Sequence, residues 1–504
     1  MVRKIIVVGG GSAGFMAAAA LKFKIPQVQV VVIRSPEIGI IGVGEGSGIP
    51  FTQYLHEFLG LPVDQFVRKV KPSWKLGTHF FWGSRKRFFF PFGPTLDMQL
   101  DGLTKPNGYY CADDLENASL PSAMMGLDRM FERGSNGEPL VRGNFAYHIE
   151  NETFAAFLEE LAISRGVRIV SDTIRNVRQD EHGITGLDLN SGATETADLY
   201  VDCSGFKSLL LGKAMGEPFI SYASTLFCDR AVVGGWARTT EVIHPYTTAE
   251  TMDGGWAWQI EHPNRVNRGY VYSSAFISDE DAEREFRTKN PKVGPARMVK
   301  FVSGRYERSW VKNVVAIGNA GGFVEPLEAT ALAIHATRAA LLTELLQTSD
   351  LEPCAACSDM YNDLTGRVWD CTRQFLATHY RFNTRLDTPF WRHCREHTDM
   401  AGVEPVVEWY QQMGPTSYGA PAIIDRLDIF GMDGYLTTLL GQCVPHHSKF
   451  VPATAERERW NAIRQNYVAR ARRAMTVAES LDWFMHPEKH ETKPLEISSV
   501  VVMR

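Results

Sequence analysis

The chain has 504 residues, of which 44% are hydrophobic and 22% charged, and its formal net charge is −5. This length allows roughly two to four domains, or one large domain with insertions, and the composition is typical of a globular protein. The acidic balance argues against a nucleic-acid partner. No apolar run reaches the ~18 residues of a membrane-spanning helix, and a strand pattern stands where a signal peptide would, so we expect a cytoplasmic protein without membrane contacts.

The N-terminus predicts a dinucleotide-binding turn. An apolar, β-branched run at 4–8 indicates a buried parallel strand, and an alanine-rich run at 15–21 indicates a helix. A G-x-G-x-x-G turn joins them, in which the glycines permit a tight turn, close approach of a pyrophosphate and close helix–strand packing. The helix N-terminus then offers N–H groups to phosphates. The expected cofactor contacts are Gly9, Gly11, Ser12, Ala13 and Gly14.

A second strand is expected at 29–33, at the spacing of a βαβ unit. Arg34 follows it, where an acidic residue usually meets the ribose hydroxyls. Arg34 therefore indicates either a 2′-phosphate or a different adenosine contact. The glycine-rich run at 38–47 comes next and suits a strap against a flat ligand, because glycine permits close approach. Its expected cofactor contacts are Gly42, Val43, Gly44 and Glu45.

Lys75 lies among large apolar residues in the stretch 71–82. Most lysines are solvated surface charges, but burial disfavours the charged form and leaves a reactive amine. An aromatic run follows at 88–93 and is either ordinary core or the wall of a flat, apolar substrate pocket. The residues expected to line that pocket are Phe90, Pro91 and Phe92.

Further along, strands are expected at 167–170 and 199–202 and a helix at 153–162, and a β-rich portion contains the stretch 254–260, which is a possible strand. Trp256 and Trp258 would share one face of their strand and form an apolar wall or part of the core. A buried strand at 313–320 is expected to turn into a helix, and the chain is mostly helical from about 350. We expect a domain at 1–350 with insertions at about 70–145 and 215–300, and a helical subdomain at 351–504 that covers the substrate site.

The eight cysteines do not indicate a disulfide framework. Cys354 and Cys357 form a C-x-x-C, but no second pair, suitably spaced histidine or βα redox context accompanies it. We interpret this motif as coincidental and expect no metal and no structural disulfide.

Together these stretches resemble, over nearly the whole chain, the flavin-dependent halogenases related to tryptophan halogenases. The matching motifs are Gly-Gly-Gly-Ser-Ala-Gly (9–14), Gly-Val-Gly-Glu (42–45), Lys-Leu-Gly (75–77), Asp-Cys-Ser-Gly-Phe (202–206), Gly-Trp-Ala-Trp-Gln-Ile (255–260), Pro-Leu-Glu-Ala-Thr-Ala (326–331), His-Tyr (379–380) and Asp-Thr-Pro-Phe-Trp (387–391). The Trp-x-Trp-x-Ile motif is the most diagnostic, since flavin hydroxylases of this fold lack it. The resemblance implies an α/β fold: a Rossmann-like FAD-binding core of the GR2 flavin monooxygenase type, a mixed-sheet substrate region and a mostly helical C-terminal part.

The resemblance also implies a chemistry. A separate NAD(P)H-dependent flavin reductase supplies FADH2, which with O2 and chloride or bromide gives hypohalous acid. Lys75 matches the lysine that holds this acid by a hydrogen bond or as a haloamine and passes the halogen to an electron-rich arene. Glu328 matches a glutamate that stabilises the arenium cation or orients the halogenating species; from its local pattern alone it is a helix-start acid.

Four further positions are implied in the same way. Backbone N–H groups of Thr330 and Ala331 would bind the halide. Gly318 and Leu332 lie at the second strand–helix junction, which faces the ribityl chain and flavin ring in two-part flavin folds.

The chain departs from the family pattern at several positions. Ala331 stands where glycine is usual, which predicts a positive-φ penalty and an altered halide preference. Ala329 replaces a serine, and Glu261 replaces the proline after the tryptophan motif.

The substrate region departs as well. Phe90 replaces a histidine, and the aromatic residues of 405–450 do not form the loop that clamps free tryptophan. We therefore expect a less polar indole, a phenol or another electron-rich aromatic, free or carrier-bound.

Two other functions stay open. One is an FAD-dependent aromatic hydroxylase with its own NAD(P)H site, which Arg34 favours. The other is a non-catalytic flavin-binding or carrier-docking module, and the presence of Lys75 and Glu328 argues against it. The sequence leaves a homodimer open.

Overall fold

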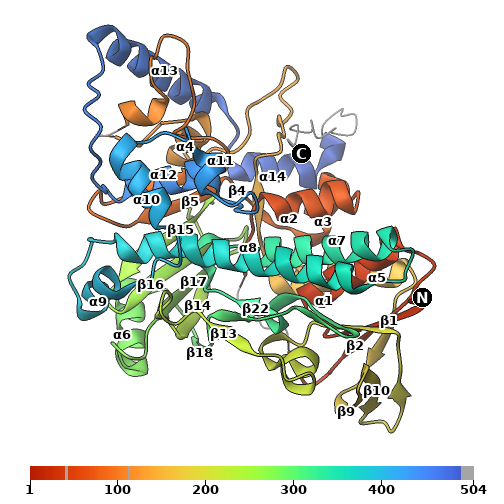
Figure 1. The fold of residues 1–504 in the computed structure, drawn as a ribbon. Helices are drawn as coiled ribbons and strands as arrows, with labels where there is room; N and C mark the ends of the chain where they lie inside the picture. Colours follow the sequence, from red (N-terminus) through yellow and green to blue (C-terminus); the bar gives the residue numbers. More distant parts are fainter. Residues whose placement is uncertain (40–43, 112–113, 490–504) are drawn as a thin grey trace. The chain divides into compact units, whose positions relative to one another are not determined.

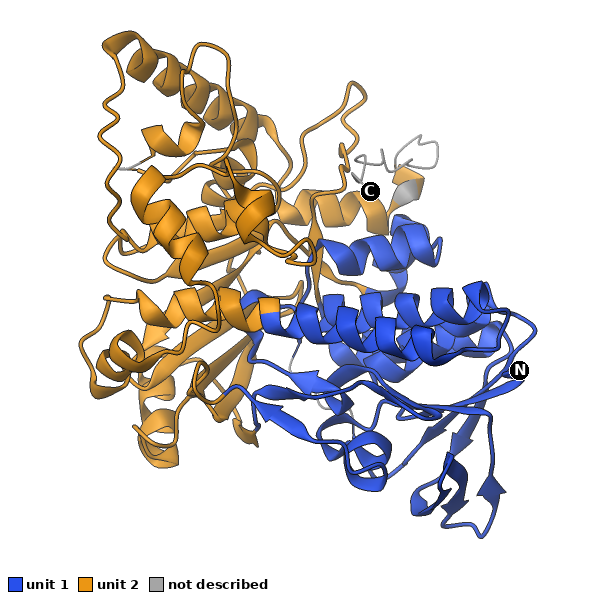
Figure 2. Ribbon diagram, viewed as in Figure 1, with its two compact units in different colours: residues 1–70, 149–222, 301–370 blue, residues 71–148, 223–300, 371–504 orange. Residues whose placement is uncertain are grey.

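The computed structural model describes residues 1–39, 44–111 and 114–489. The chain divides into two compact units, each assembled from three segments (Figure 2). Unit 1 comprises 1–70, 149–222 and 301–370, and unit 2 comprises 71–148, 223–300 and 371–504. The division at residue 350 that the sequence suggests stays a prediction.

Unit 1 is organised around a six-stranded sheet with the order β20-β21-β12-β1-β2-β8. These strands are β20 (Trp310–Val311), β21 (Val314–Ala316), β12 (Leu199–Asp202), β1 (Lys4–Val8), β2 (Gln29–Arg34) and β8 (Arg168–Ser171). All neighbours pair in parallel except β20 with β21. Val8, Asp202, Ala316 and Ile33 lie level with one another at the carboxyl edge, which is where such sheets bind ligands.

Helices cover this sheet because its strands are apolar on both faces. The alanines at 17–20 of α1 (Ser12–Lys24) are buried, and their small side chains let α1 lie close to α5 (Asn151–Ser164) and α7 (Ala331–Thr348) (Figure 1). Unit 1 also contains the short helices α2 (Ile49–Gln53), η1 (Tyr54–Phe58), α3 (Val63–Val70), η3 (Gly205–Lys207) and η4 (Leu209–Ala214). Two small sheets belong to it as well. One is made of β9 (Ile174–Asp180), β10 (Gly183–Leu189) and β11 (Thr194–Glu195), and the other of β13 (Phe219–Ser221), β19 (Gly304–Tyr306) and β22 (Gly322–Phe323).

Unit 2 contains a mixed seven-stranded sheet, as the resemblance implies, with the order β18-β14-β17-β16-β15-β5-β6. The strands are β18 (Arg297–Lys300), β14 (Arg230–Ala237), β17 (Arg265–Tyr272), β16 (Gly255–Glu261), β15 (Tyr246–Met252), β5 (Gly77–Phe81) and β6 (Phe88–Pro91). Only β15 and β5 pair in parallel. Helix α6 (Asp279–Lys289) packs against β14 and β17, over a core that includes Tyr270 and Phe286 (Figure 1).

The part of the chain after residue 350 is mostly helical, as expected. Helix α8 (Ala355–Arg381) begins in unit 1 and ends in unit 2. The helices that follow are α9 (Pro389–His397), α10 (Glu404–Met413), α11 (Ala420–Ile423), α12 (Gly431–Gly441), α13 (Thr454–Arg473), α14 (Val477–Met485) and η7 (Pro487–Lys489). Among the helices that the structure describes, each is too short or too polar to cross a bilayer.

The strand expected at 313–320 does not continue directly into a helix. After β21 come the short turns η5 (Gly318–Ala320) and η6 (Pro326–Glu328), and α7 begins only at Ala331. Positive φ angles at Gly318 (+83°) and Ala329 (+54°) interrupt the helical path. These turns present the backbone of 318–331 at the carboxyl edge of the sheet instead of hiding it inside a helix.

The start of α13 supplies a test of the fold. Glu456 accepts hydrogen bonds from the Thr104 hydroxyl (2.6 Å) and the Tyr110 hydroxyl (2.8 Å), which tie α13 to the segment near residue 105. These bonds, the one from Thr104 foremost, lower the pKa of Glu456 to about 2 from 4.5. The carboxylate therefore stabilises the fold fully above pH 4.5, and its contribution is lost as the pH falls from 4.5 toward 2.

We expect Glu456→Gln to lower Tm at pH 7 and the difference from wild type to shrink as the pH falls below 4.5, measured by thermal unfolding monitored by circular dichroism. Glu458→Gln, at an exposed position on the same helix, is the matched control. A deficit in Glu456→Gln that stays constant down to pH 3 would contradict this assignment.

Candidate functional site

The turn between β1 and α1 in unit 1 has the shape that a phosphate needs. A Cβ at Gly9 would lie 2.2 Å from the Cys203 carbonyl oxygen, and one at Gly14 would lie 1.9 Å from the Gly9 carbonyl oxygen, so both positions require glycine. Gly11 differs, because nothing lies within 4 Å of its Cβ position. Gly11 is also the N-cap of α1, whose first turn carries no acidic residue. The backbone N–H groups at this helix start therefore have room for an anion.

The segment that follows β21 in unit 1 contacts this turn. Gly318 (φ +83°) follows β21, and a Cβ there would lie 2.7 Å from the Ala13 Cβ. Leu332 is buried in the first turn of α7. The structure thus brings Gly9, Gly14, Ala13 and Gly318, all predicted as cofactor contacts, into one region of unit 1.

His335 is a polar group in this region that the sequence reasoning missed. Its ring lies 3.9 Å from the Gly318 Cβ position, and its Nε2 is buried without a hydrogen-bond partner in the described part of the chain. Burial lowers the pKa of His335 to about 4, so the ring is neutral. An unsatisfied buried polar atom costs about 1–3 kcal/mol, which a polar group of a bound cofactor would offset. In sequence His335 is one histidine in an apolar helix, and nothing marks it. The open glycine turn and this nitrogen fit a dinucleotide such as FAD.

The glycine-rich strap is described in part. Gly44 donates its N–H to the Asn151 Oδ1 (3.1 Å), and the Asn151 amide donates to the carboxylate of Glu45 on β3 (Glu45–Gly46). Burial raises the pKa of Glu45, and the Asn151 hydrogen bond opposes that shift. Asn151 thereby fixes this end of the strap to the start of α5. Gly42 and Val43 lie outside the described residues.

Arg34 at the end of β2 has a partner in the same unit. Its guanidinium lies 2.6 Å from the Glu159 carboxylate on α5, and its stem covers Gly10. A 2′-phosphate would have to compete with Glu159 for this charge. The ion pair therefore weighs against a 2′-phosphate at Arg34.

The predicted halide segment lies at the start of α7. Thr330 is the N-cap and makes no side-chain cap, and the first turn of this 18-residue helix has no acidic residue. Glu328 ends the short turn before it, half-buried. The positive end of the helix dipole therefore faces the stretch that carries the predicted halide donors.

The expected positive-φ penalty at Ala331 is wrong. Ala331 is the first helical residue of α7, where alanine is favourable. The left-handed residue is Ala329 (φ +54°, ψ 39°), which follows the turn η6. A non-glycine residue held there stores about 1–3 kcal/mol of backbone strain.

Lys75 lies in unit 2 on β4 (Ser73–Lys75), which pairs antiparallel with β7 (Ala146–Ile149). Its side chain is 1% exposed, and its Nζ lies 5.4 Å from the centroid of the Phe92 ring. Trp74, which precedes Lys75 on β4, contacts the rings of Phe131 (5.0 Å) and Tyr147 (5.3 Å). All three residues of β4 are buried, and the amine lies out of water beside the Phe92 ring, as the sequence predicts.

His148 is a second polar group on this strand pair that the sequence does not reveal. It stands opposite Ser73, two residues from Lys75, so all three side chains lie on one face. The Ser73 hydroxyl donates to the Glu261 carbonyl, so it accepts from His148 Nδ1 (3.3 Å), while His148 Nε2 accepts from the Thr247 hydroxyl (2.8 Å). Burial first, and then Lys75, hold the pKa of His148 well below 6.5. A neutral histidine therefore accompanies the lysine.

Glu261, which stands where the family usually has proline, is held by neighbouring side chains. Its buried carboxylate forms an ion pair with Arg238 and accepts from Gln259 Nε2 (2.7 Å). Its carbonyl holds Ser73. The residue that replaces the family's proline is thus joined to β4, the strand that carries Lys75.

The predicted substrate-pocket residues divide between two places. The strand register puts Phe90, Trp256 and Trp258 on one face of the seven-stranded sheet, with Trp258 over Gly269. Pro91 points to the opposite face, and Phe92 lies beyond β6 next to Lys75. Phe90 also contacts Phe375 at 5.9 Å. The structure brings the two tryptophans and Phe90 together, and their role in substrate binding stays a prediction.

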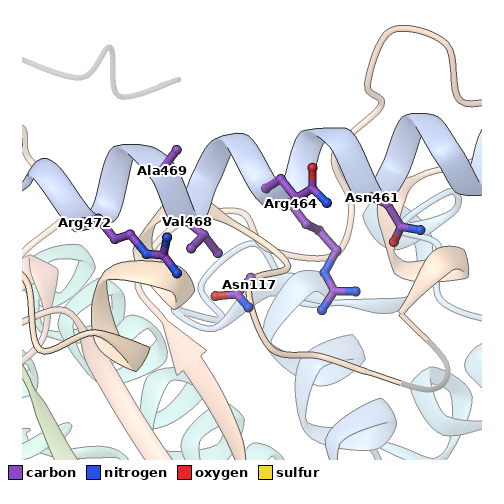
Figure 3. Close-up of a pocket in the computed structure, with 7 residues that line it drawn as sticks. Asn117, Asn461, Arg464, Val468, Ala469 and Arg472 are labelled. Atoms are coloured by element: carbon purple, nitrogen blue, oxygen red, sulfur yellow. The ribbon is translucent and has the colours of Figure 1, made fainter.

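A pocket of about 410 Å³ also lies in unit 2, along α13 (Figure 3). Arg464 in it forms an ion pair with Asp114 and donates to the Glu116 carbonyl (2.8 Å). The lining residues are Asn117, Asn461, Arg464, Gln465, Val468, Ala469 and Arg472. None of the predicted site residues lines it.

Comparison with known proteins gives consistent matches. The family model described as tryptophan halogenase matches residues 4–456. The chain is 32% identical over 464 residues to tryptophan 7-halogenase RebH of Lentzea aerocolonigenes, covering 85% of each protein. The crystal structure of MibH, a lanthipeptide tryptophan 5-halogenase, matches with a TM-score of 0.87 and 39% identity over 97% of this chain and 94% of that one. The tryptophan 6-halogenase SttH of Streptomyces toxytricini matches with a TM-score of 0.86 and 28% identity over 95% and 99%.

A pair of glycine variants tests the cofactor turn. We expect Gly14→Ala to lower Tm or prevent folding, because its Cβ meets the Gly9 carbonyl oxygen. Gly11→Ala has no such clash, so it should keep the wild-type Tm without cofactor and bind FAD roughly tenfold more weakly, since its methyl group enters the space for the phosphate. Thermal unfolding and flavin fluorescence titration give the two readouts. Wild-type FAD affinity in Gly11→Ala would refute the assignment.

His335→Leu tests the unpartnered imidazole. Removal of an unsatisfied buried nitrogen should raise the Tm of the cofactor-free protein, while FAD binding weakens several-fold because the cofactor loses a polar contact. His335→Gln, which keeps a polar nitrogen, should bind FAD more tightly than His335→Leu. Equal FAD affinities for wild type and both variants would exclude a role for His335 toward the cofactor.

Proposed function

The chain belongs to the tryptophan halogenase family, and we propose that it uses FADH2, O2 and chloride or bromide to halogenate an electron-rich aromatic ring through Lys75. As a flavin-dependent halogenase it is an oxidoreductase. The observation that carries the proposal is the burial of Lys75 beside Phe92, on a strand framed by aromatic rings. A surface lysine would be hydrated, whereas burial keeps water away from this amine.

The turn at 9–14, Gly318 and the start of α7 would hold the cofactor, with the Glu45 end of the strap beside it. FAD, when bound in its reduced form, supplies with O2 the two-electron oxidation that converts halide to hypohalous acid. A separate NAD(P)H-dependent flavin reductase would deliver it. The backbone N–H groups of Thr330 and Ala331 would bind the halide, because a helix start without acidic residues favours an anion.

Lys75 would carry the halogen to the substrate. Its ammonium can donate a hydrogen bond to hypohalous acid, or its neutral amine, which burial favours, can form an N–X bond with release of water. His148, neutral and fixed in one tautomer, adds no second positive charge to this face. Ser73 and Glu261 hold β4 in register, so the amine has a fixed position.

Glu328 would act on the arene. A carboxylate stabilises the positive charge that develops on the ring as halogen adds, or it orients the halogenating species. Its position one turn before the halide donors keeps it close to them in sequence and structure.

The substrate is proposed to be an indole-like or phenolic ring. Phe90 and the two tryptophans offer an apolar, flat surface to such a ring. RebH is named for tryptophan and MibH for a lanthipeptide tryptophan, which supports an indole and makes one attached to a larger molecule worth testing beside the free ring.

An FAD-dependent hydroxylase with its own NAD(P)H site is the second candidate. The ion pair of Arg34 with Glu159 weakens the argument from Arg34 for this candidate. Oxidation of NADPH without a reductase, with a product that gains oxygen instead of halogen, would identify this alternative.

A reductase-coupled assay tests the proposed function. Indole, free tryptophan and a tryptophan-containing peptide are each incubated with FAD, NADH, reductase and either chloride or bromide, and products are identified by mass. We expect a monohalogenated product, with free tryptophan the poorest substrate, because Phe90 stands where a histidine is usual and the aromatic residues of 405–450 do not match a tryptophan-clamping loop. No halogenated product from any of the three, with a hydroxylated one instead, would overturn the proposal.

Glu328→Gln separates the catalytic from the structural role of that residue. We expect halogenation to slow by about 10²-fold or more, because a preorganised charge near a developing cation is lost. FAD affinity should stay at the wild-type value. Glu344→Gln, exposed on α7, is the matched control. Parallel loss of FAD binding and activity in Glu328→Gln would assign the residue a structural role.

A further inference from the structure

The C-x-x-C motif lies at the start of a long helix in unit 1. Cys354 directly precedes the first residue of α8, and the Cys357 N–H donates to the Cys354 carbonyl (3.0 Å). Cys354 is exposed and Cys357 partly exposed, and neither is in a disulfide. The sequence supplied no context for this pair, and the helix start now does.

The Cys354 sulfur is set up as a nucleophile. Hydrogen bonding, from the Cys357 backbone N–H foremost and then from the Ala356 N–H and the Cys357 thiol, lowers the pKa of the Cys354 thiol. No acidic residue stands in the first turn of α8 to oppose the thiolate. A helix start and a thiol one turn away are the two features that activate C-x-x-C cysteines.

The other cysteines differ from this pair. Burial raises the pKa of Cys111 to about 12 and that of Cys203 well above 9, so both are inert. Cys443 is exposed but has no cysteine at i±3. It is therefore a lone accessible thiol within the same chain and serves as an internal comparison.

We propose that Cys354 and Cys357 form a redox-active dithiol that reduces hypohalous acid and is regenerated from the resulting disulfide by an external thiol reductant. The choice of oxidant rests on the proposed function, which releases hypohalous acid. The dithiol destroys acid that escapes from the protein's own reaction before it reaches other side chains.

The chemistry balances in two steps. The Cys354 thiolate attacks the halogen of HOX, so that an S–X bond forms, the O–X bond breaks and hydroxide leaves. The Cys357 sulfur then attacks the Cys354 sulfur, so that the S–S bond forms, the S–X bond breaks, halide leaves and the Cys357 proton goes to hydroxide as water. Two thiols are oxidised and one HOX is reduced to halide. A lone thiol has no such second step and proceeds to sulfinic and sulfonic acids.

The first experiment uses reagent hypochlorite and needs no halogenase activity. The full-length protein receives a single equivalent, remaining thiols are alkylated, and peptides are identified by mass. We expect the Cys354–Cys357 disulfide to exceed all oxidised forms of Cys443 by about tenfold and to disappear with dithiothreitol. In Cys357→Ser, Cys354 should give irreversible acids instead. Equal oxidation of Cys443 and the pair, or over-oxidation of the intact pair, would overturn the proposal.

The second experiment uses turnover with reductase, FAD and bromide. The disulfide should accumulate with bromide and not without it, and the Cys354→Ser/Cys357→Ser variant should start at the wild-type rate and lose activity in fewer turnovers. A disulfide with reagent hypochlorite but none during turnover would contradict the proposal that this protein's reaction supplies the oxidant. No disulfide in either experiment would contradict the dithiol itself.

Discussion

The burial of one amine is the constraint on which the account of unit 2 depends. Taking a lysine side chain out of water is costly, because the charged form loses its hydration. The protein holds Lys75 there by packing aromatic rings on β4 and beside it, and by keeping the adjacent His148 neutral in a hydrogen-bonded tautomer. The buried Glu261–Arg238 pair is joined to the same strand through Ser73. These contacts make sense together if the amine has to be reactive and fixed.

In unit 1 the main feature is the placement of backbone N–H groups where anions are expected to bind. Two helices, α1 and α7, begin at the carboxyl edge of the parallel sheet without an acidic first turn. Glycines at 9 and 14 allow the first helix to approach its strand, and the open position at Gly11 leaves room for a phosphate. The left-handed Ala329 delays the second helix, so that its first N–H groups follow Glu328. One physical device, the positive end of a helix, thus serves both the expected cofactor and the expected halide.

Local features were predictable from sequence, and long-range ones were not. The strands 4–8 and 199–202 were predicted with their observed bounds, and the shared face of Trp256 and Trp258 follows from strand periodicity. The network of Ser73, His148 and Glu261 joins three distant segments, so no local pattern reveals it. Similarly, the backbone angle at Ala331 depends on the turn that precedes it, and family comparison placed the strained residue two positions too late.

The C-x-x-C motif at Cys354 and Cys357 is a second example of a feature that the sequence alone did not explain. As a string of letters it lacked the companions of a metal or redox motif, and coincidence was the reasonable interpretation. Its meaning changes once Cys354 is seen at the exposed start of α8, one turn from Cys357. The chemistry of a motif is decided by the dipoles around it, which sequence spacing alone does not specify.

The most direct test of the central claim separates formation of hypohalous acid from its use. Lys75→Ala and the surface control Lys105→Ala are supplied with reductase, FAD and bromide, and hypohalous acid is captured by a small-molecule trap while halogenated arene is measured by mass. Lys75→Ala should form trapped acid at the wild-type rate and give halogenated arene only at the level of the uncatalysed reaction, with Lys105→Ala unchanged in both. A normal yield of halogenated arene from Lys75→Ala would remove the lysine from the reaction and contradict the account.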